Sequence, residues 1–327
     1  MRATARMRWR CLNFLPRCPR LITLFSLFMF LTGASAIHAQ TPNPAASGLA
    51  PKAEQGFSPG WTLGTRFEGS SSGDGTIYDL GTAIGYNFTH HFAVDAGVPY
   101  YFVGTPSSIT KKNPNAVSGA GWGNLFADLK LNYPGEALNY GSTIHLTVPN
   151  GDTKKGFSTG HATWNWSNHF EHALGNFTPY LDAGVGNTVV DTRFFHRPFT
   201  TFGYNAQFEG GVEFDAGRLS LTGSAYDVAP WGPQTVISRV FRCSAGAKCA
   251  ANGKSTNRRG FTLASVQAGA ADLVRDNGFN AGIDFKPVSR LDLEFDYSCS
   301  VPLQLNSFSF GIGVDLTWLL RPSTRRH

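Results

Sequence analysis

The chain has 327 residues, of which 15% are charged and 13% are aromatic, and it contains 37 glycines. An ordinary soluble domain carries about 25% charged residues, so this composition excludes a bundle of charge-rich helices. The aromatic content and low charge exclude intrinsic disorder, and a single long apolar run excludes a helical membrane protein. What remains is a glycine- and aromatic-rich β protein with one large domain.

Residues 1–39 have the pattern of a secretory signal peptide. Six arginines and no acidic residue precede the apolar run 21–31, and small residues follow it, with Ala36 and Ala39 as the two candidate cleavage positions. Eleven residues of helix reach about 16 Å, which is shorter than a bilayer core. This favours a cleaved signal over a retained anchor, and residues 40–57 are then a flexible lead-in to the folded domain.

Removal of the signal changes the charge and the cysteine count. Of the 28 basic residues, 22 remain against 22 acidic ones, so the mature chain is not expected to bind nucleic acid. The oxidising compartment favours a disulfide between Cys243 and Cys249, with Cys299 left single. No further Cys or His pair completes four zinc ligands at a usual spacing, so we expect no metal and no cofactor.

Apolar and polar residues alternate with a period of two throughout the mature chain. In the first such segment Trp61, Leu63 and Phe67 share one face, and Thr62 and Arg66 share the other. The alternation predicts twelve strands, at 61–68, 78–88, 92–102, 124–133, 143–148, 161–170, 177–185, 202–214, 219–226, 279–286, 291–297 and 308–318.

The connections between these segments are short at one end of the strands and mostly longer at the other, a pattern typical of outer-membrane barrels. The apolar faces carry essentially no charge, whereas a soluble β-sandwich would expose charges on its outer face. Residues 58–320 are therefore predicted to form an all-β, antiparallel transmembrane β-barrel of about 12 strands, with short periplasmic turns, longer extracellular loops and a tail at 321–327.

The predicted location is the bacterial outer membrane, reached through the inner membrane with the help of the cleaved signal peptide. The partners expected there are outer-membrane lipid, lipopolysaccharide and the barrel-assembly machinery, together with a small-molecule solute that the sequence does not identify.

Residues 121–131 and 144–152, with Gly156 and Gly160 after them, resemble the MetA-pathway of phenol degradation family, a group of transporter-like outer-membrane barrels. That family has a Gly-x-Gly-Asp-like strand start and a Leu-x-x-Pro-Thr-Gly-Asp loop entry. Here Asn124 stands where Asp is usual and Asn150 where Thr is usual. The resemblance implies an outer-membrane location and uptake of hydrophobic or aromatic compounds, and it brings no catalytic residues.

The same alternation assigns most acidic residues to the inward face. The predicted lumen-lining residues are Arg66, Glu68, Asp79, Asp95, Asp128, Lys130, His145, His161, His169, Asp182, Glu209, Tyr226, Asp284, Asp292, Glu294 and Asp296. The longer loops are rich in basic residues, among them Arg193, Arg197 and Arg239. These charges predict a cation-leaning lumen below a basic mouth, unless the basic loops serve only to contact lipopolysaccharide.

Two function classes follow: a passive channel or transporter for small solutes, or a pore-less structural or surface-binding barrel. A lipid-modifying enzyme is a third, weaker hypothesis. Inward His145, His161, His169 and Glu171 could indicate metal or acid–base chemistry, but we interpret them as polar filling of a narrow lumen. Residues 260–276 are compatible with a strand extension, a short helix or an inward lid.

Overall fold

The computed structural model describes residues 57–72, 75–104, 119–239, 266–303 and 305–320. The predicted signal peptide, nearly all of the lead-in, the C-terminal tail, Cys243 and Cys249 lie outside these residues, and the predictions made for them stay predictions.

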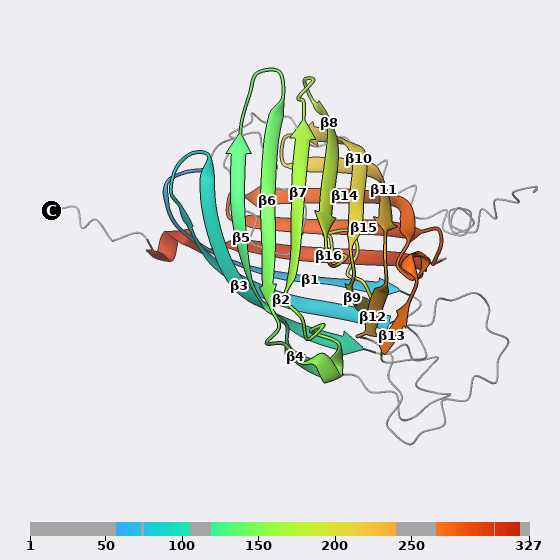
Figure 1. Ribbon diagram of the computed structural model, residues 1–327. Coiled ribbons are helices and arrows are strands. Elements are labelled where there is room, and N and C mark those ends of the chain that lie inside the picture. The colour runs from blue at the N-terminus through green and yellow to red at the C-terminus, as the bar shows by residue number, and fades with distance from the viewer. Residues whose placement is uncertain (1–56, 73–74, 105–118, 240–265, 304, 321–327) are drawn as a thin grey trace, which may run out of the picture.

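The molecule is a closed antiparallel barrel of 12 wall strands, as the period-two pattern predicts (Figure 1). Each wall strand pairs with its sequence neighbour, and the pairing of the first strand with the last closes the sheet. The wall consists of β1 (Gly60–Ser72), β2 (Gly75–Asn87), β3 (Phe92–Gly104), β4 (Gly119–Trp122) followed by β5 (Leu125–Tyr133), β6 (Asn139–Val148), β7 (Thr163–Glu171), β8 (Phe177–Gly186), β10 (Asn205–Ala216), β11 (Leu219–Pro230), β14 (Asp276–Val288), β15 (Leu291–Ser300) and β16 (Leu305–Asp315).

Strands β4 and β5 form one wall strand that is interrupted at Gly123 and Asn124, since both pair with β3. At this break the Asn124 side chain accepts a hydrogen bond from the Gly151 backbone N–H (3.1 Å), and the Asn150 side chain accepts one from the Leu125 N–H (2.7 Å). The two asparagines thus satisfy backbone groups that the interrupted ladder leaves unpaired.

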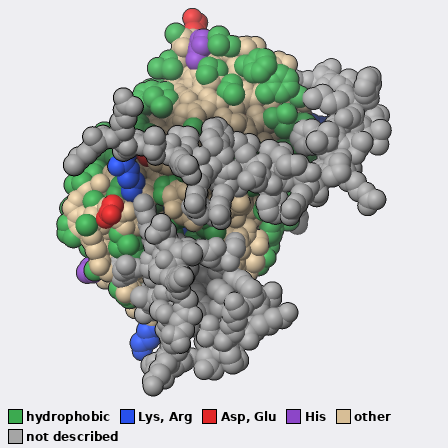
Figure 2. Space-filling view, turned by 90° about the vertical axis from the view of Figure 1, so that its right-hand side faces the viewer, with side chains coloured by type: hydrophobic (Ala, Val, Ile, Leu, Met, Phe, Trp, Pro, Cys, Tyr) green, Lys and Arg blue, Asp and Glu red, His purple; other side chains and the backbone are tan. Residues whose placement is uncertain are grey.

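The wall has its polar side chains inside and its apolar side chains outside. Exposed large hydrophobic residues include Leu80, Ile84, Leu181 and Phe208, whereas charged residues such as Asp79 are buried. Figure 2 shows hydrophobic side chains spread over the outer surface of the wall. This distribution is the reverse of that in a soluble domain and suits a wall surrounded by lipid.

Several strand boundaries differ from the prediction, and at three of them a residue assigned to a wall strand lies outside it. His161 lies before β7 in the connecting loop, Phe202 belongs to a separate strand, and Trp318 lies in the 3₁₀ helix η5 (Thr317–Leu320). At Phe202 the reason is local, because Gly203 adopts a positive φ of 151° that bends the chain between the two strands. At the C-terminal end, the Asp315 side chain accepts a hydrogen bond from the Thr317 N–H (2.8 Å) and the 3₁₀ helix begins.

A second, three-stranded sheet lies at the loop end of the barrel and consists of β9 (Phe199–Phe202), β12 (Gln234–Ser238) and β13 (Val266–Gly269) (Figure 1). The described part of residues 260–276 contains β13 and the 3₁₀ helix η4 (Ala271–Leu273). The remaining 3₁₀ helix, η2 (Thr153–Lys155), lies in the β6–β7 loop. Within the described ranges, no helix has the length and apolarity needed to cross a membrane.

Cys299 is disulfide-bonded and not single as the sequence analysis expected. Its partner is outside the described residues, since Cys299 is the only cysteine within them. A bond from Cys299 to Cys243 or Cys249 would compete with the predicted pairing of those two, because each sulfur forms one disulfide.

The apolar outward face predicts that a lysine destabilises the protein much more at a wall position than at a turn position. Leu181, 50% exposed in the middle of β8, faces outward, and Leu174, 57% exposed, lies in the turn between β7 and β8. We expect Leu181→Lys to lower the free energy of unfolding in lipid vesicles by about 2–4 kcal/mol and Leu174→Lys by about 0–1 kcal/mol. Urea titration followed by tryptophan fluorescence measures both, and equal effects would contradict a lipid-facing wall.

Candidate functional site

The loop between β8 and β9, residues 187–198, folds into the barrel, and we call it the inward loop. Phe194 is only 1% exposed, and its carbonyl accepts a hydrogen bond from the Ser309 hydroxyl of β16 (2.8 Å). The wall makes room for the ring at Gly282 of β14, where a Cβ atom would lie 2.9 Å from Phe194. Backbone and side-chain contacts therefore hold this loop against the inner wall.

Three arginines that the sequence analysis assigned to a basic mouth are paired inside the barrel instead. Arg193 donates to Asp284 (2.7 Å) and Thr222 (3.0 Å). Arg197 lies 3.4 Å from Asp276. For Arg193 and Arg197 the expectation was wrong because buried wall carboxylates need counter-charges, and the inward loop brings cations to them.

Arg239, which follows β12, pairs with Asp191 of the inward loop (2.5 Å) and lies over the Tyr101 ring at 5.1 Å from its centroid. Burial by itself would raise the pKa of Asp191, but the guanidinium of Arg239 and the imidazole of His196 outweigh it and the pKa is lowered. Burial would lower the pKa of Arg239, and Asp191 outweighs it in turn, so that pKa is raised. Both shifts favour the ionised pair.

Carboxylates of β1 and β15 surround Arg66, which is 3% exposed, and Asp79 of β2 lies opposite one of them in the sheet. Arg66 forms ion pairs with Glu68 and Glu294, and its Nη1 lies 3.6 Å from Asp292. His196 of the inward loop reaches the same cluster through Glu68 and Asp79. Carboxylates outnumber basic groups here.

On the opposite part of the wall, charges pair between neighbouring strands. Lys130 donates to Asp95 (2.5 Å), and His145 contacts Asp128 (2.6 Å). His169 contacts Asp182 through Nδ1 (2.8 Å) and Glu171 through Nε2 (2.9 Å), so both ring nitrogens are engaged.

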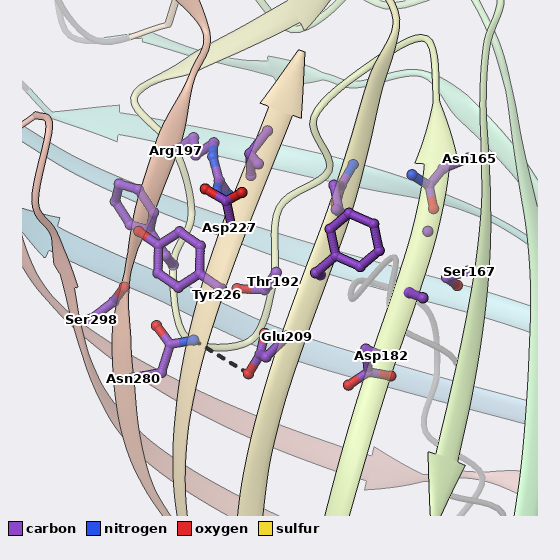
Figure 3. Close-up of a pocket in the computed structure, with 16 residues that line it drawn as sticks. Asn165, Ser167, Asp182, Thr192, Arg197, Glu209, Tyr226, Asp227, Asn280 and Ser298 are labelled. Carbon is purple, nitrogen blue, oxygen red and sulfur yellow. Dashed lines mark hydrogen bonds between the residues drawn. The ribbon is translucent and has the colours of Figure 1, made fainter.

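Between the inward loop and strands β7, β8, β10, β11, β14 and β15 lies a small cavity of about 30 Å³, enough for about two water molecules (Figure 3). Glu209 faces it and accepts hydrogen bonds from Tyr180 (3.2 Å), Ser224 (2.6 Å) and Asn280 (3.3 Å). Among the described residues, no lysine or arginine pairs with Glu209. The cavity thus has Glu209 and Asp182 on its wall side and Arg197 on the side of the inward loop.

Most of the predicted lumen-lining residues point inward. Those that are buried are Arg66, Glu68, Asp79, Asp128, Lys130, His169, Asp182, Glu209, Asp284, Glu294 and Asp296. Asp95, His145, Tyr226 and Asp292 are partly buried in the same lumen. His161 does not belong to this set, because it is exposed in the β6–β7 loop.

His161 instead stacks on Phe202, with ring centroids 4.5 Å apart. The two rings border a cleft of about 450 Å³ at the loop end, between the β6–β7 loop and the small sheet. Sequence reasoning missed this cleft and the inward course of residues 187–198. The run Arg193 to Arg197 contains Phe194 and Phe195 between its basic residues, which is an unusual composition for a loop in water and was the available signal.

No family model matches the sequence, and no curated protein matches it. Among solved structures, the COG4313 outer membrane channel from Pseudomonas putida F1 is similar, with 13% identity, 82% of this chain and 100% of that chain covered, and a TM-score of 0.51. The KdgM porin in complex with oligogalacturonate has 7% identity over 77% of this chain and 98% of that chain, with a TM-score of 0.43. The NanC porin has 6% identity over 77% and 100%, with a TM-score of 0.44. The first of these shows the fold, that of an outer-membrane β-barrel.

The Arg193–Asp284 pair predicts coupling between the inward loop and the wall. We expect Arg193→Met to lower the free energy of unfolding by about 3 kcal/mol, because it leaves the buried Asp284 carboxylate uncompensated. The double variant with Asp284→Leu should recover most of this loss. Urea titration of both single variants and the double variant measures the coupling, and additive losses would show that the pair does not hold the loop.

The lowered pKa of Asp191 predicts loosening of the same loop in acid. A carboxyl group whose pKa is lower in the folded state stabilises fully above its unfolded value of about 3.9 and loses this effect as the pH falls through the folded value. We expect the free energy of unfolding to decline below about pH 4, and less steeply in Asp191→Asn. Unfolding titrations from about pH 7 to about pH 3 test this; identical slopes would exclude a contribution from Asp191.

Proposed function

We propose that this protein is a passive channel of the bacterial outer membrane for small solutes. The observation that carries the proposal is the polar, charged interior of a closed barrel whose outer surface is apolar. A barrel that served only as a scaffold has no need of ionised groups inside, and these are costly to bury unless they face water or partners.

The charge of the lumen favours cations over anions. Glu209 faces the cavity, where its hydrogen-bond partners are the neutral Tyr180, Ser224 and Asn280, with Arg197 on the other side of the cavity. The Arg66 cluster adds further carboxylates. Because Arg193, Arg197 and Arg239 also lie inside, we expect a weaker preference than the sequence alone predicts.

For the class of solute, we propose hydrophobic or aromatic compounds, on the basis of the resemblance to the MetA-pathway of phenol degradation family. The cleft at the loop end supports this, since the stacked pair His161 and Phe202 places aromatic rings at its border and its volume of about 450 Å³ is that of a small-molecule site. We also propose that the signal peptide directs export of the chain through the inner membrane. Its partners in the outer membrane are then lipid, lipopolysaccharide and the barrel-assembly machinery.

A pore-less barrel is the second candidate, and the inward loop is the observation that favours it. The cavity beside the loop has room for about two water molecules, which is too narrow for a solute unless the loop moves. We propose no catalytic role, and we interpret His145 and His169, which pair with neighbouring carboxylates, as part of the charge network of the lumen.

Single-channel recording in planar bilayers tests the proposal. We expect the wild-type protein to conduct, with a reversal potential in a KCl gradient that indicates cation preference, and Glu209→Gln to reduce that preference because it removes an unpaired lumen charge. Arg193→Ala should raise the conductance, since it releases the inward loop from β14. The control Glu136→Gln is the same substitution in the exposed turn between β5 and β6, and it should change neither value.

Anion preference would contradict the assignment of a cation-leaning lumen. Absence of conductance in both the wild type and Arg193→Ala, with the heat-modifiable gel migration of a folded barrel, would favour the pore-less candidate.

A further inference from the structure

Three potential metal ligands from three separate segments meet on the inner wall. Glu68 of β1 and Asp79 of β2 are direct cross-strand neighbours and both point inward. His196 of the inward loop places its Nε2 atom 3.2 Å from Glu68 Oε2 and 3.2 Å from Asp79 Oδ1. The ligand atoms of the three side chains all lie within 4.8 Å of one another.

Hydrogen bonds do not satisfy these atoms. Each of the three residues is no more than 4% exposed, and neither Glu68 Oε2, Asp79 Oδ1 nor His196 Nε2 has a hydrogen-bond partner. Since 3.2 Å suits a hydrogen bond, the two oxygens must lie off the direction in which an Nε2–H group would point. Burying such groups without well-directed hydrogen bonds is costly, and a metal ion would satisfy all three atoms at once.

The histidine is held in position by its backbone and not by its ring. The Ser70 hydroxyl donates to the His196 carbonyl (2.9 Å) and accepts from the His196 N–H (3.2 Å). The ring is thus presented to the two carboxylates by a fixed backbone, as expected of a preorganised ligand.

The local charge also favours a cation. Two carboxylates directly opposite on neighbouring strands repel each other. Arg66 contacts Glu68 but is shared with Glu294 and Asp292. Three carboxylates therefore share one guanidinium, and Asp79 adds a fourth carboxylate beside Glu68. A divalent ion between Glu68 and Asp79 would reduce this excess while leaving Arg66 to orient Glu68 from outside.

The distances fit a small divalent ion. Zinc binds histidine nitrogen and carboxylate oxygen at about 2.0–2.2 Å, and a tetrahedral arrangement then separates neighbouring ligand atoms by about 3.4 Å, close to the observed 3.2 Å. The imidazole ligand favours zinc and similar transition metals over calcium or magnesium, which prefer oxygen alone.

We propose that Glu68, Asp79 and His196 form a binding site for a divalent transition-metal ion of the zinc type, with a fourth position open to water. Because His196 belongs to the inward loop and the two carboxylates belong to the wall, the ion fastens the loop to β1 and β2. This proposal is independent of whether the barrel conducts.

Zinc titration of the full chain without an affinity tag tests the site. The folded barrel in detergent is stripped with EDTA, its heat-modifiable migration is checked, and ZnCl₂ is added in competition with a chromophoric chelator. We expect one tightly bound equivalent, and an affinity reduced at least about tenfold in His196→Gln and in Asp79→Asn. Co²⁺ in place of zinc should give visible d–d absorption that His196→Gln abolishes.

His169→Gln is the matched control, because His169 is also buried between two carboxylates but has both nitrogens engaged at 2.8 and 2.9 Å. It should leave the bound equivalent unchanged. If folded His196→Gln and folded Asp79→Asn both still bind zinc tightly, the zinc is bound by surface histidines such as His161 and the proposal is overturned. Absence of tight zinc binding to the wild type would overturn it as well. Two ligand variants guard against one failing to fold.

Discussion

The requirement that no backbone group be left unpaired in lipid determines the rest of this structure. Hydrocarbon offers no hydrogen bonds, so a sheet can lie in it only if its first and last strands pair. The β1–β16 ladder supplies this pairing from Gly64 to Ser72. Closure gives every wall strand a lipid face and a lumen face, and the alternation of side chains then places Leu80 outside and Asp79 inside at adjacent positions.

A narrow lumen creates a second requirement, because carboxylates on neighbouring strands lie too close together to stay ionised without cations. The wall supplies a few of these, as in the Lys130–Asp95 pair. The inward loop supplies others through Arg193 and Arg197. The same loop therefore both neutralises wall carboxylates and fills the lumen. A motion of the loop that opened the lumen would have to replace these ion pairs with contacts to water or solute.

The wall was predictable from the sequence because a period of two is a local property that each strand shows independently. The pattern identified twelve segments and assigned Arg66 and Glu209 to the inward face, and both are buried in the structure. The course of the inward loop was not predictable in this way. Arg193 and Arg197 are basic residues in a long connection. They lie in the lumen because their partners there, Asp284 and Asp276, are on strands that are distant in the sequence. His161 was misassigned because one further alternating residue does not show where a strand ends.

The two buried histidines illustrate why spacing along the chain could not identify the unsatisfied site. His169 and its partner Glu171 are two residues apart on β7, and Asp182 faces them from the next strand. His196 is more than a hundred residues from Glu68 and Asp79, and its register with them depends on the Ser70 contact and on the Phe194 position over Gly282. A ligand set assembled by a folded-in loop leaves no local motif, so its only signature is three-dimensional: converging buried atoms without partners.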